Sequence, residues 1–145
     1  MKFTKATNYA LHTMMYIALV PAGKVIGVKP LADMLQVSPT YLSKILTRLV
    51  KAGIIVSTPG VHGGYKLSKS GKEVSFLDVI HAVEGTASLF QCEFEHGEAS
   101  PLCLIQQEMN EAEKKMEDHL QSKKISDFSE KLGDSMKDLV LREAK

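Results

Sequence analysis

Long apolar runs are missing from this chain of 145 residues. The most apolar stretch near the N-terminus, residues 14–20, is short, whereas a membrane-spanning helix needs about 20 residues. The polar residues before it indicate an amphipathic helix and not a secretory leader. Cysteine is also scarce, since Cys92 and Cys103 are too few for a disulfide scaffold and are normal as free thiols in the cytoplasm. We therefore expect a cytoplasmic protein with no membrane partner.

Recognisable catalytic motifs are absent as well. The sequence has no C-x-x-C, no G-x-G-x-x-G, no P-loop and no H-E-x-x-H. No nucleophile is paired with a base at a recognisable spacing. These absences argue against an enzyme. A thiol-based redox enzyme built on the two cysteines is the alternative that we retain.

Acidic residues are almost missing from the first half of the chain. Residues 1–72 carry ten lysines and arginines against one acid, Asp33, for a net charge of +9. Residues 73–145 carry eight cations against sixteen acids, for a net charge of −8. A basic half is the electrostatic footprint of a nucleic-acid contact, and an enzyme has no need for such a split. We predict that the basic half faces DNA and that the acidic half faces away.

Residues 30–67 have the layout of a winged helix-turn-helix, in which two short helices joined by a tight turn precede a hairpin. The first helix is predicted to begin at Pro30, because the first turn of a helix tolerates proline, and to end near Leu35. After a turn at 36–37, Ser38 suits the N-cap of a second helix and Gly53 suits its end. The inner stripe of that helix is Leu42, Ile45, Leu46 and Leu49.

The other face of the second helix carries hydroxyls, one phenol and three cations but no carboxylate. Phosphates need donors and positive charge, and base edges need compact hydrogen-bonding groups, so this face favours DNA. An ordinary solvated helix face is the less specific interpretation, and a winged helix that contacts only proteins is a third. The predicted DNA-binding residues here are Ser38, Thr40, Tyr41, Ser43, Lys44, Thr47, Arg48 and Lys51.

The wing is predicted from the run 54–57, which is rich in β-branched residues, and the segment 65–67; the two flank a tip with three glycines. Glycine permits a positive φ and a close approach of the backbone to a phosphate or to the minor groove. His62 and Lys66 are the polar side chains of the wing and join the predicted DNA contacts. A short strand at 24–26 is expected to pair with the wing.

Three amphipathic helices are expected around this module. Residues 4–20 have an apolar stripe at helical spacing. Ser75 and Asp78 are spaced as a capping box for a helix that Gly85 ends. A last helix is expected from Ser126, with apolar positions at 128, 132, 136 and 140.

A long helix is expected to open at 100–101, with an apolar seam that begins at Leu102 and repeats at spacings of three and four. A single long seam on a small protein needs a partner, and a second copy of the chain is the expected one. Packing on the chain's own helix at 4–20 is the alternative. The predicted dimer residues are Ile105, Met109, Ala112, Met116 and Leu120.

The segment 85–101 has no helical or strand period and is long for so small a protein, which is typical of a functional loop. With Ser100 as cap, Cys103 would take the third position of the long helix, where the helix dipole favours a thiolate. Cys92 and Cys103 both lie at this loop. Two inert thiols and a reversible thiol or disulfide sensor are the alternatives that the residues leave open.

Several of these patterns together resemble one family. The runs at 37–46, 51–54 and 63–67 read VSPTYLSKIL, KAGI and GGYKL, and they are similar to those of the Rrf-two family of winged helix transcriptional regulators. The resemblance covers nearly the whole chain and implies a homodimer that binds a double-stranded DNA operator as a repressor or activator. At the position before the first wing glycine, where the family usually has an arginine, this chain has Pro59.

Cluster-binding members of that family hold iron with three cysteines in the region of the loop. Cys92 and Cys103 match the first and last of these positions, but the middle one falls at 96–98 and is not a cysteine. The cysteine count therefore argues against a three-thiolate iron–sulfur cluster. The resemblance thus implies Cys92, His96 and Cys103 as the candidate sensor residues, and a cluster with mixed ligation by these three is the further alternative.

The expected fold is thus mainly α with a small β wing: a winged helix-turn-helix DNA-binding domain plus a long dimerisation helix. We expect a DNA-binding domain at 1–84, a sensor-type loop at 85–101 and a helical dimerisation region at 102–145. The expected function is that of a dimeric transcriptional repressor that responds to a redox or thiol signal, and no cofactor is expected.

Overall fold

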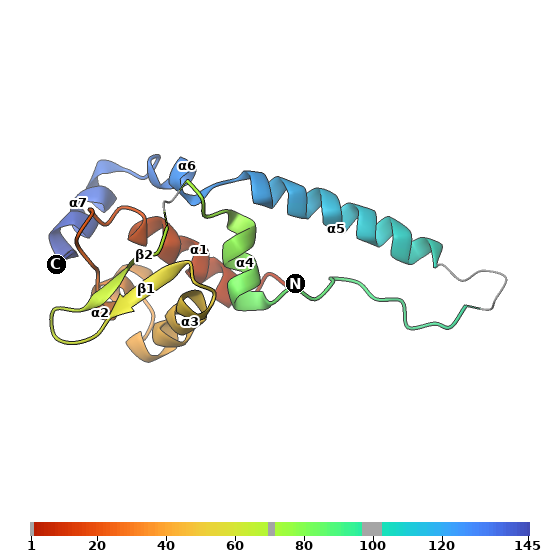
Figure 1. Ribbon diagram of the computed structural model, residues 1–145, viewed down its shortest axis with the longest axis horizontal. Helices are drawn as coiled ribbons and strands as arrows, with labels where there is room; N and C mark the ends of the chain where they lie inside the picture. The colour runs from red at the N-terminus through yellow and green to blue at the C-terminus, as the bar shows by residue number, and fades with distance from the viewer. Residues whose placement is uncertain (1, 70–71, 97–102) are drawn as a thin grey trace.

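The computed structural model describes residues 2–69, 72–96 and 103–145, and within them the chain is mainly helical with one two-stranded antiparallel sheet (Figure 1). This arrangement confirms the predicted fold class. None of the described helices is long and apolar enough to cross a membrane. In chain order the elements are α1 (Lys5–Ile17), α2 (Val28–Leu35), α3 (Pro39–Lys51), β1 (Ile55–Thr58), β2 (Gly64–Leu67), α4 (Phe76–Glu84), α5 (Leu104–Ser122), α6 (Ile125–Ser129) and α7 (Asp134–Glu143).

The helix-turn-helix forms where its capping residues predict it. The side chain of Ser38 accepts a hydrogen bond from the backbone N–H of Tyr41 at 3.1 Å, which starts α3. Gly53 follows α3 with a φ of +77°, a left-handed conformation that glycine adopts without strain. α2 begins at Val28, two residues before the predicted start, because Gly27 takes its N-cap position.

The wing is an antiparallel hairpin in which Ile55 lies opposite Leu67 and Thr58 opposite Gly64. The strand predicted at 24–26 is reduced to a single bridge between Ile26 and Tyr65. Ile26 is fully buried, so this bridge ties the base of the wing to the hydrophobic core.

The C-terminal helices complete the core of the winged helix. The single helix predicted from Ser126 is wrong, because α6 ends at Ser129 and Gly133 is the N-cap of a separate helix, α7. The break lets Ile125 and Val140 both enter the core around Met14, where all three are fully buried. In one straight helix those two side chains would lie about 22 Å apart along the axis. The three-part division of the chain stays a prediction, and its first and third parts share this core.

An arm projects from this body, formed by α5 and by residues 86–96, which run beside it (Figure 1). The backbone N–H of Leu89 donates to the Glu113 carboxylate at 3.1 Å and joins the two segments. At the base of the arm, Met116 and Leu120 of α5 pack against Leu77 and Ile80 of α4. The intrachain partner of the seam is therefore α4 and not the helix at 4–20 that we considered as the alternative.

The first turn of α5 differs from the prediction. Cys103 has an extended backbone, with φ −76° and ψ 118°, and it is the N-cap of the helix. The prediction that Cys103 occupies the third helical position is therefore wrong. Its thiol itself accepts the hydrogen bond of the backbone N–H of Gln106, at 3.4 Å. The predicted cap and first turn at Ser100 and Pro101, and the first seam residue Leu102, lie outside the described residues.

Candidate DNA interface and sensor arm

The face of α3 that points away from the core carries the predicted DNA-binding residues. Seven of the eight on α3 and its cap are exposed, and Ser43 is half-buried. Some of these groups also have roles within the chain. The Thr47 hydroxyl donates to the carbonyl of Ser43 at 2.8 Å, and the ring of Tyr41 meets the ring of Tyr9 edge-on, with centroids 5.7 Å apart. Lys44 and Lys51 extend the surface with positive charge, as phosphate contacts require.

Arg48 has a partner that the sequence did not indicate. Its Nη1 donates to the carbonyl of Val83, in the last turn of α4, at 3.0 Å. A guanidinium has five N–H donors, so one bond to a carbonyl does not exhaust it. The contact joins residues 35 positions apart, and no local spacing pattern predicts such a tertiary bond.

The glycines of the wing tip have two different roles. Gly60 has a φ of +96° and turns the chain, as the sequence predicts. Gly63 and Gly64 do not have a positive φ, and both lie where a Cβ would collide with the chain's own backbone. The close approach that we expected toward DNA is therefore made, at these two positions, within the protein. His62 and Lys66 are both exposed beside them.

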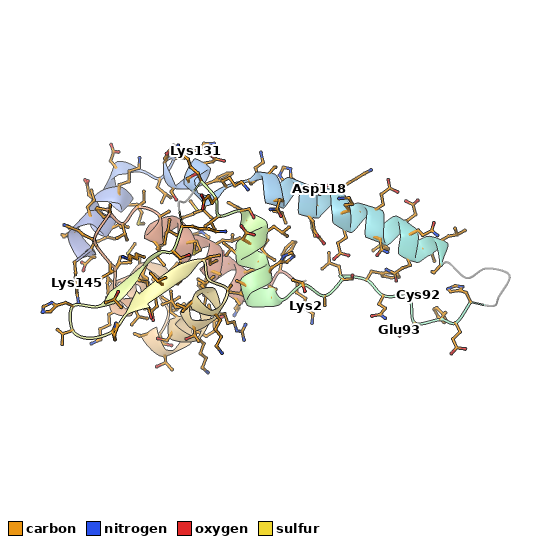
Figure 2. The ribbon with its side chains drawn as sticks, in the orientation of Figure 1. Lys2, Cys92, Glu93, Asp118, Lys131 and Lys145 are labelled. Carbon is orange, nitrogen blue, oxygen red and sulfur yellow. The ribbon has the colours of Figure 1, made fainter. Side chains whose placement is uncertain are left out.

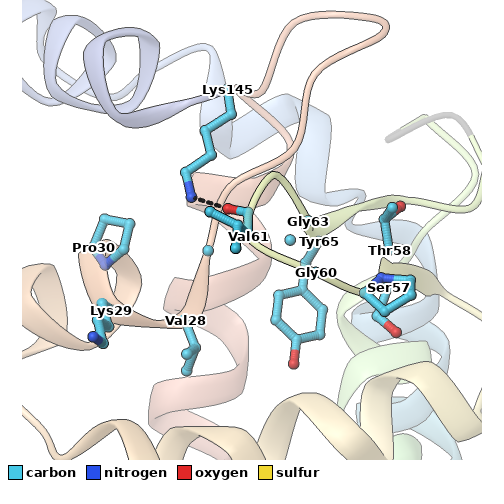
Figure 3. Close-up of a pocket in the computed structure, with 13 residues that line it drawn as sticks. Val28, Lys29, Pro30, Ser57, Thr58, Gly60, Val61, Gly63, Tyr65 and Lys145 are labelled. Atoms are coloured by element: carbon cyan, nitrogen blue, oxygen red, sulfur yellow. Dashed lines mark hydrogen bonds between the residues drawn. The ribbon is translucent and has the colours of Figure 1, made fainter.

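Lys145 holds the tip of the wing through a side-chain hydrogen bond (Figure 3). Its backbone N–H donates to the carbonyl of Val25 at 2.8 Å and its carbonyl accepts from the N–H of Val25 at 3.3 Å. Its Nζ donates to the carbonyl of Val61 at 2.9 Å. Between this contact, the wing tip and the first turn of α2 lies an open pocket of about 500 Å³. These bonds fix the tip that presents His62.

The three predicted sensor residues come together toward the far end of the arm, where Figure 2 labels Cys92. The Sγ atoms of Cys92 and Cys103 and a ring nitrogen of His96 all lie within 4.8 Å of one another. Cys92 Sγ is 3.3 Å from His96 Nε2. The three residues line a cavity of about 330 Å³ together with Phe90, Phe94 and neighbouring residues.

Gln106 holds this group in place, and sequence reasoning missed it. Its Oε1 accepts from the backbone N–H of Cys92 at 2.6 Å, and its Nε2 donates to the carbonyl of Phe90 at 3.0 Å. Its own backbone N–H donates to Cys103 Sγ. One residue of α5 therefore fixes both cysteines relative to each other. The sequence offered one signal for this role. Gln106 lies three residues after Cys103, and an N-cap side chain accepts its hydrogen bond from the backbone N–H two or three residues further along the chain.

The environment of Cys103 favours its thiolate. The hydrogen bond from the backbone N–H of Gln106 is the main cause that lowers the pKa of the Cys103 thiol below its ordinary value. Desolvation raises this pKa, whereas hydrogen bonds to Cys92 and to the backbone of Ile105 lower it further. The helix-dipole argument predicted this direction, although Cys103 lies at the N-cap.

Two thiols and one imidazole are also a donor set that divalent transition metals accept. Around a tetrahedral zinc ion, with bonds of about 2.0–2.3 Å, ligand atoms lie about 3.3–3.8 Å apart. The three atoms here lie within 4.8 Å of one another, so a closure of about 1 Å fits them around one ion. An iron–sulfur cluster takes four protein ligands, and this group supplies three.

The predicted dimer seam divides into two parts. Met116 and Leu120 are half-buried against α4, whereas Ala112 is exposed. Ile105 and Met109 are 65% and 42% exposed, and Leu89 and Leu104 beside them are 47% and 74% exposed. We call these last four residues the arm patch. No residue of α5 is fully buried, so the outer half of the helix has an apolar surface that the described residues of one copy leave uncovered.

Comparison with known proteins places these features in a family. Residues 3–131 match the family profile described as Rrf2, iron-dependent transcriptional regulator. A protein of Lactococcus lactis subsp. lactis (strain IL1403) that carries the name HTH-type transcriptional regulator YffB is 37% identical over 91 residues. That match covers 63% of this chain and 58% of the relative.

Solved structures of similar shape cover almost the whole chain. The oxidized form of CymR from Staphylococcus aureus is similar with a TM-score of 0.71 and 26% identity, over 92% of this chain and 99% of that one. CymR of B. subtilis, called its global cysteine regulator, has a TM-score of 0.72 and 22% identity, with the same shares covered. The second likeness is evidence of the fold alone.

Proposed function

The chain belongs to the Rrf2 family of transcriptional regulators, and from this premise we propose that it acts as a homodimer on a double-stranded DNA operator, with α3 in the major groove. The observation that carries this proposal is the exposed surface of α3, which has three cations, several hydroxyls and no carboxylate. It lies in the half of the chain with a net charge of +9. Family membership argues against an enzyme, since these proteins are regulators of transcription.

The proposed dimer places two α3 helices on one face of the DNA. Such helices read two half-sites about 34 Å apart, or a multiple of that distance, so the operator should be a pseudo-palindrome. A dimer that covers this length excludes other proteins from the same DNA. We therefore propose repression as its output and the cytoplasm as its place of action.

Substitution of Lys44 or Lys51 by alanine tests the DNA contact. Each lysine that neutralises a phosphate contributes about one unit to the slope of log affinity against log salt concentration. Lys44→Ala and Lys51→Ala should each flatten that slope by about one unit and weaken binding to all sequences alike. The measurement is fluorescence anisotropy on a DNA fragment selected by the protein from a random library and on a scrambled fragment.

Lys115→Ala is the matched control, because Lys115 is exposed on α5 and its removal changes the charge equally. Its salt dependence should equal that of the wild type. An unchanged slope in both α3 variants would contradict the placement of α3 against DNA. Failure to select any fragment would contradict the proposed function as a whole.

We further propose that Cys92, His96 and Cys103 form the sensor, in the first instance as a thiol switch. The Cys103 thiolate attacks an oxygen of a peroxide to give a sulfenic acid and one water, with protonation of the leaving oxygen. The Cys92 thiol then attacks this sulfur, a disulfide forms and the second water leaves. Two electrons pass from the thiols to the peroxide in total. The two Sγ atoms lie within 4.8 Å, so a small movement of the loop closes the bond.

A divalent transition metal ion is the second candidate ligand of the same residues. It is favoured by the proximity of the three ligand atoms. Cys92, His96 and Cys103 would hold the ion, which would supply a rigid link between the loop and α5. Gln106 would orient the loop from behind. An iron–sulfur cluster, the remaining alternative, would require a further ligand from outside this group.

The lowered pKa of Cys103 predicts how its reactivity depends on pH. Because a lowered pKa shifts thiolate formation to lower pH, the alkylation rate of folded Cys92→Ser protein should rise at lower pH than that of the same protein unfolded in guanidinium. Iodoacetamide labelling followed by mass spectrometry measures both profiles. Coincident profiles would contradict the proposed activation of Cys103.

The same proteins separate the candidate signals. Peroxide should change the operator affinity of the wild type but not of Cys103→Ser, if the thiols respond. A visible absorption band upon addition of Co²⁺ to reduced wild type, and its loss in the two cysteine variants, would identify an ion site instead. An operator affinity that follows neither peroxide nor metal would remove the sensor role from these residues.

A further inference from the structure

The last turn of α4 is held from two sides by hydrogen bonds that the DNA contact and the sensor do not use. On one side, Arg48 of α3 donates to the carbonyl of Val83 at 3.0 Å. On the other, the carboxylate of Glu84 accepts from the start of α1. Its Oε1 receives the backbone N–H of Thr4 at 3.1 Å, the hydroxyl of Thr7 at 2.8 Å and the hydroxyl of Thr4.

These bonds are stronger than an ordinary surface contact. Thr4 is the N-cap of α1, so the Glu84 carboxylate lies at the positive end of that helix dipole. Hydrogen bonds to an ionised acceptor are about twice as strong as neutral ones. Burial raises the pKa of Glu84, but the hydrogen bonds from Thr4 and Thr7 outweigh it and hold this pKa below its ordinary value. The carboxylate is therefore in its charged, bond-accepting form at neutral pH.

The same turn is the point where the arm begins. Gly85 has a φ of +82° and directs the chain out of α4 into residues 86–96, which lead to Cys92. The opposite face of α4 packs on the base of α5 through Leu77 and Ile80. Both segments of the arm, residues 86–96 and α5, thus meet α4, and α4 is hydrogen-bonded directly to α3, the helix proposed to face DNA.

We propose that the last turn of α4 is the joint that couples the arm to α3, with Arg48 and Glu84 as its positioning residues. A change in the conformation of the loop at Cys92 displaces Gly85 through the connecting residues. The last turn of α4 moves with Gly85, and the Arg48–Val83 hydrogen bond transmits this movement to α3. Glu84 holds the turn on the start of α1, so that α4 rotates as a rigid helix about this point and its last turn does not unwind. This proposal rests on the proposed function, because it assigns the route by which the sensor arm reaches the DNA surface.

A shift in the conformations of the arm supplies the test. If DNA binding and the arm are coupled, bound operator changes the populations of the arm conformations. The alkylation rate of Cys103 reports these populations, because it depends on the accessibility and environment of the thiol. The experiment measures the alkylation rate of Cys103 by mass spectrometry, with and without saturating operator fragment, in reduced full-length protein. We expect operator to change this rate by about fivefold or more in the wild type. In Glu84→Gln and in Thr7→Val the two rates should agree within about twofold, while the operator is still bound.

Glu73→Gln is the matched control, because it removes the same charge from an exposed residue three positions before the first residue of α4. It should keep the full response to operator. Thr7→Val nearly preserves the shape of its buried side chain and removes one donor to Glu84, so a folded variant is available even if Glu84→Gln proves unstable. Circular dichroism melting verifies the folding of each.

The outcomes distinguish the two proposals. Absence of operator binding in the wild type would overturn the proposed function. Operator binding without any change in the Cys103 rate would overturn the joint and leave the DNA function intact. A response that persists unchanged in Glu84→Gln and Thr7→Val would show that coupling follows another route, and it would also overturn the joint.

Discussion

Substitution of both Ile105 and Met109 by glutamate is expected to convert the dimer into monomers and to lower operator affinity by about a hundredfold or more. Both residues belong to the arm patch and are 65% and 42% exposed in one copy of the chain, so the monomer should still fold. In the proposed dimer the new carboxylates would be buried without partners, which costs several kcal/mol. Each 1.4 kcal/mol is a factor of ten in affinity, and a monomer also loses the second half-site.

Sedimentation velocity and anisotropy on the selected operator measure the two effects. The control is Gln107→Glu with Gln121→Glu, which adds the same charge to exposed positions of α5 outside the arm patch. We avoid Met116 in this test, because it packs against α4 within the chain and its substitution would damage the monomer. A glutamate double variant that remains dimeric would remove the arm patch from the interface.

Gly64→Ala is expected to destabilise the wing by about 3 kcal/mol, with a loss of about 10 °C in Tm. A Cβ at this position would lie 2.6 Å from the carbonyl oxygen and 2.7 Å from the carbonyl carbon of Ile26. These are backbone atoms of the bridge that ties the wing to the core, so they cannot move aside as a flexible side chain does. Operator affinity should fall with the loss of wing order.

Thermal melting followed by circular dichroism checks this expectation. Gly133→Ala is the control, because no atom beyond its two chain neighbours lies within 4 Å of the added Cβ and its φ is −63°. The control should stay within about 1 kcal/mol of the wild type, which reflects its N-cap position. Equal melting of the two variants would show that the wing can relax around a methyl group.

Local chemistry predicted most of the elements. Ser38 and Gly53 mark the ends of α3, and the reciprocal bonds of Ser75 and Asp78 at the start of α4 form the predicted capping box. Such signals act within one turn of the chain and therefore appear as fixed spacings in the sequence. The grouping of Cys92, His96 and Cys103 was also anticipated, from the resemblance to a family whose cluster-binding members hold iron at the corresponding positions.

What the sequence left open depends on contacts between distant segments. From its place on α3, Arg48 was predicted to contact DNA only. The structure shows that one of its N–H groups instead donates to the carbonyl of Val83. The break between α6 and α7 follows from the need to bury both Ile125 and Val140 in one core, which no local period reveals. Gly63 and Gly64 were expected to have the freedom of glycine, whereas the fold requires their lack of a Cβ.

The shared core also has a consequence for synthesis on the ribosome. The helix proposed to face DNA is translated well before Ile125 and Val140, which fill the core around Met14. A nascent chain that has emerged as far as the arm still leaves the apolar side of α1 uncovered there, which invites chaperone binding or aggregation. The winged helix should thus reach its native packing after the arm has been translated, so an incomplete polypeptide would not compete for the operator.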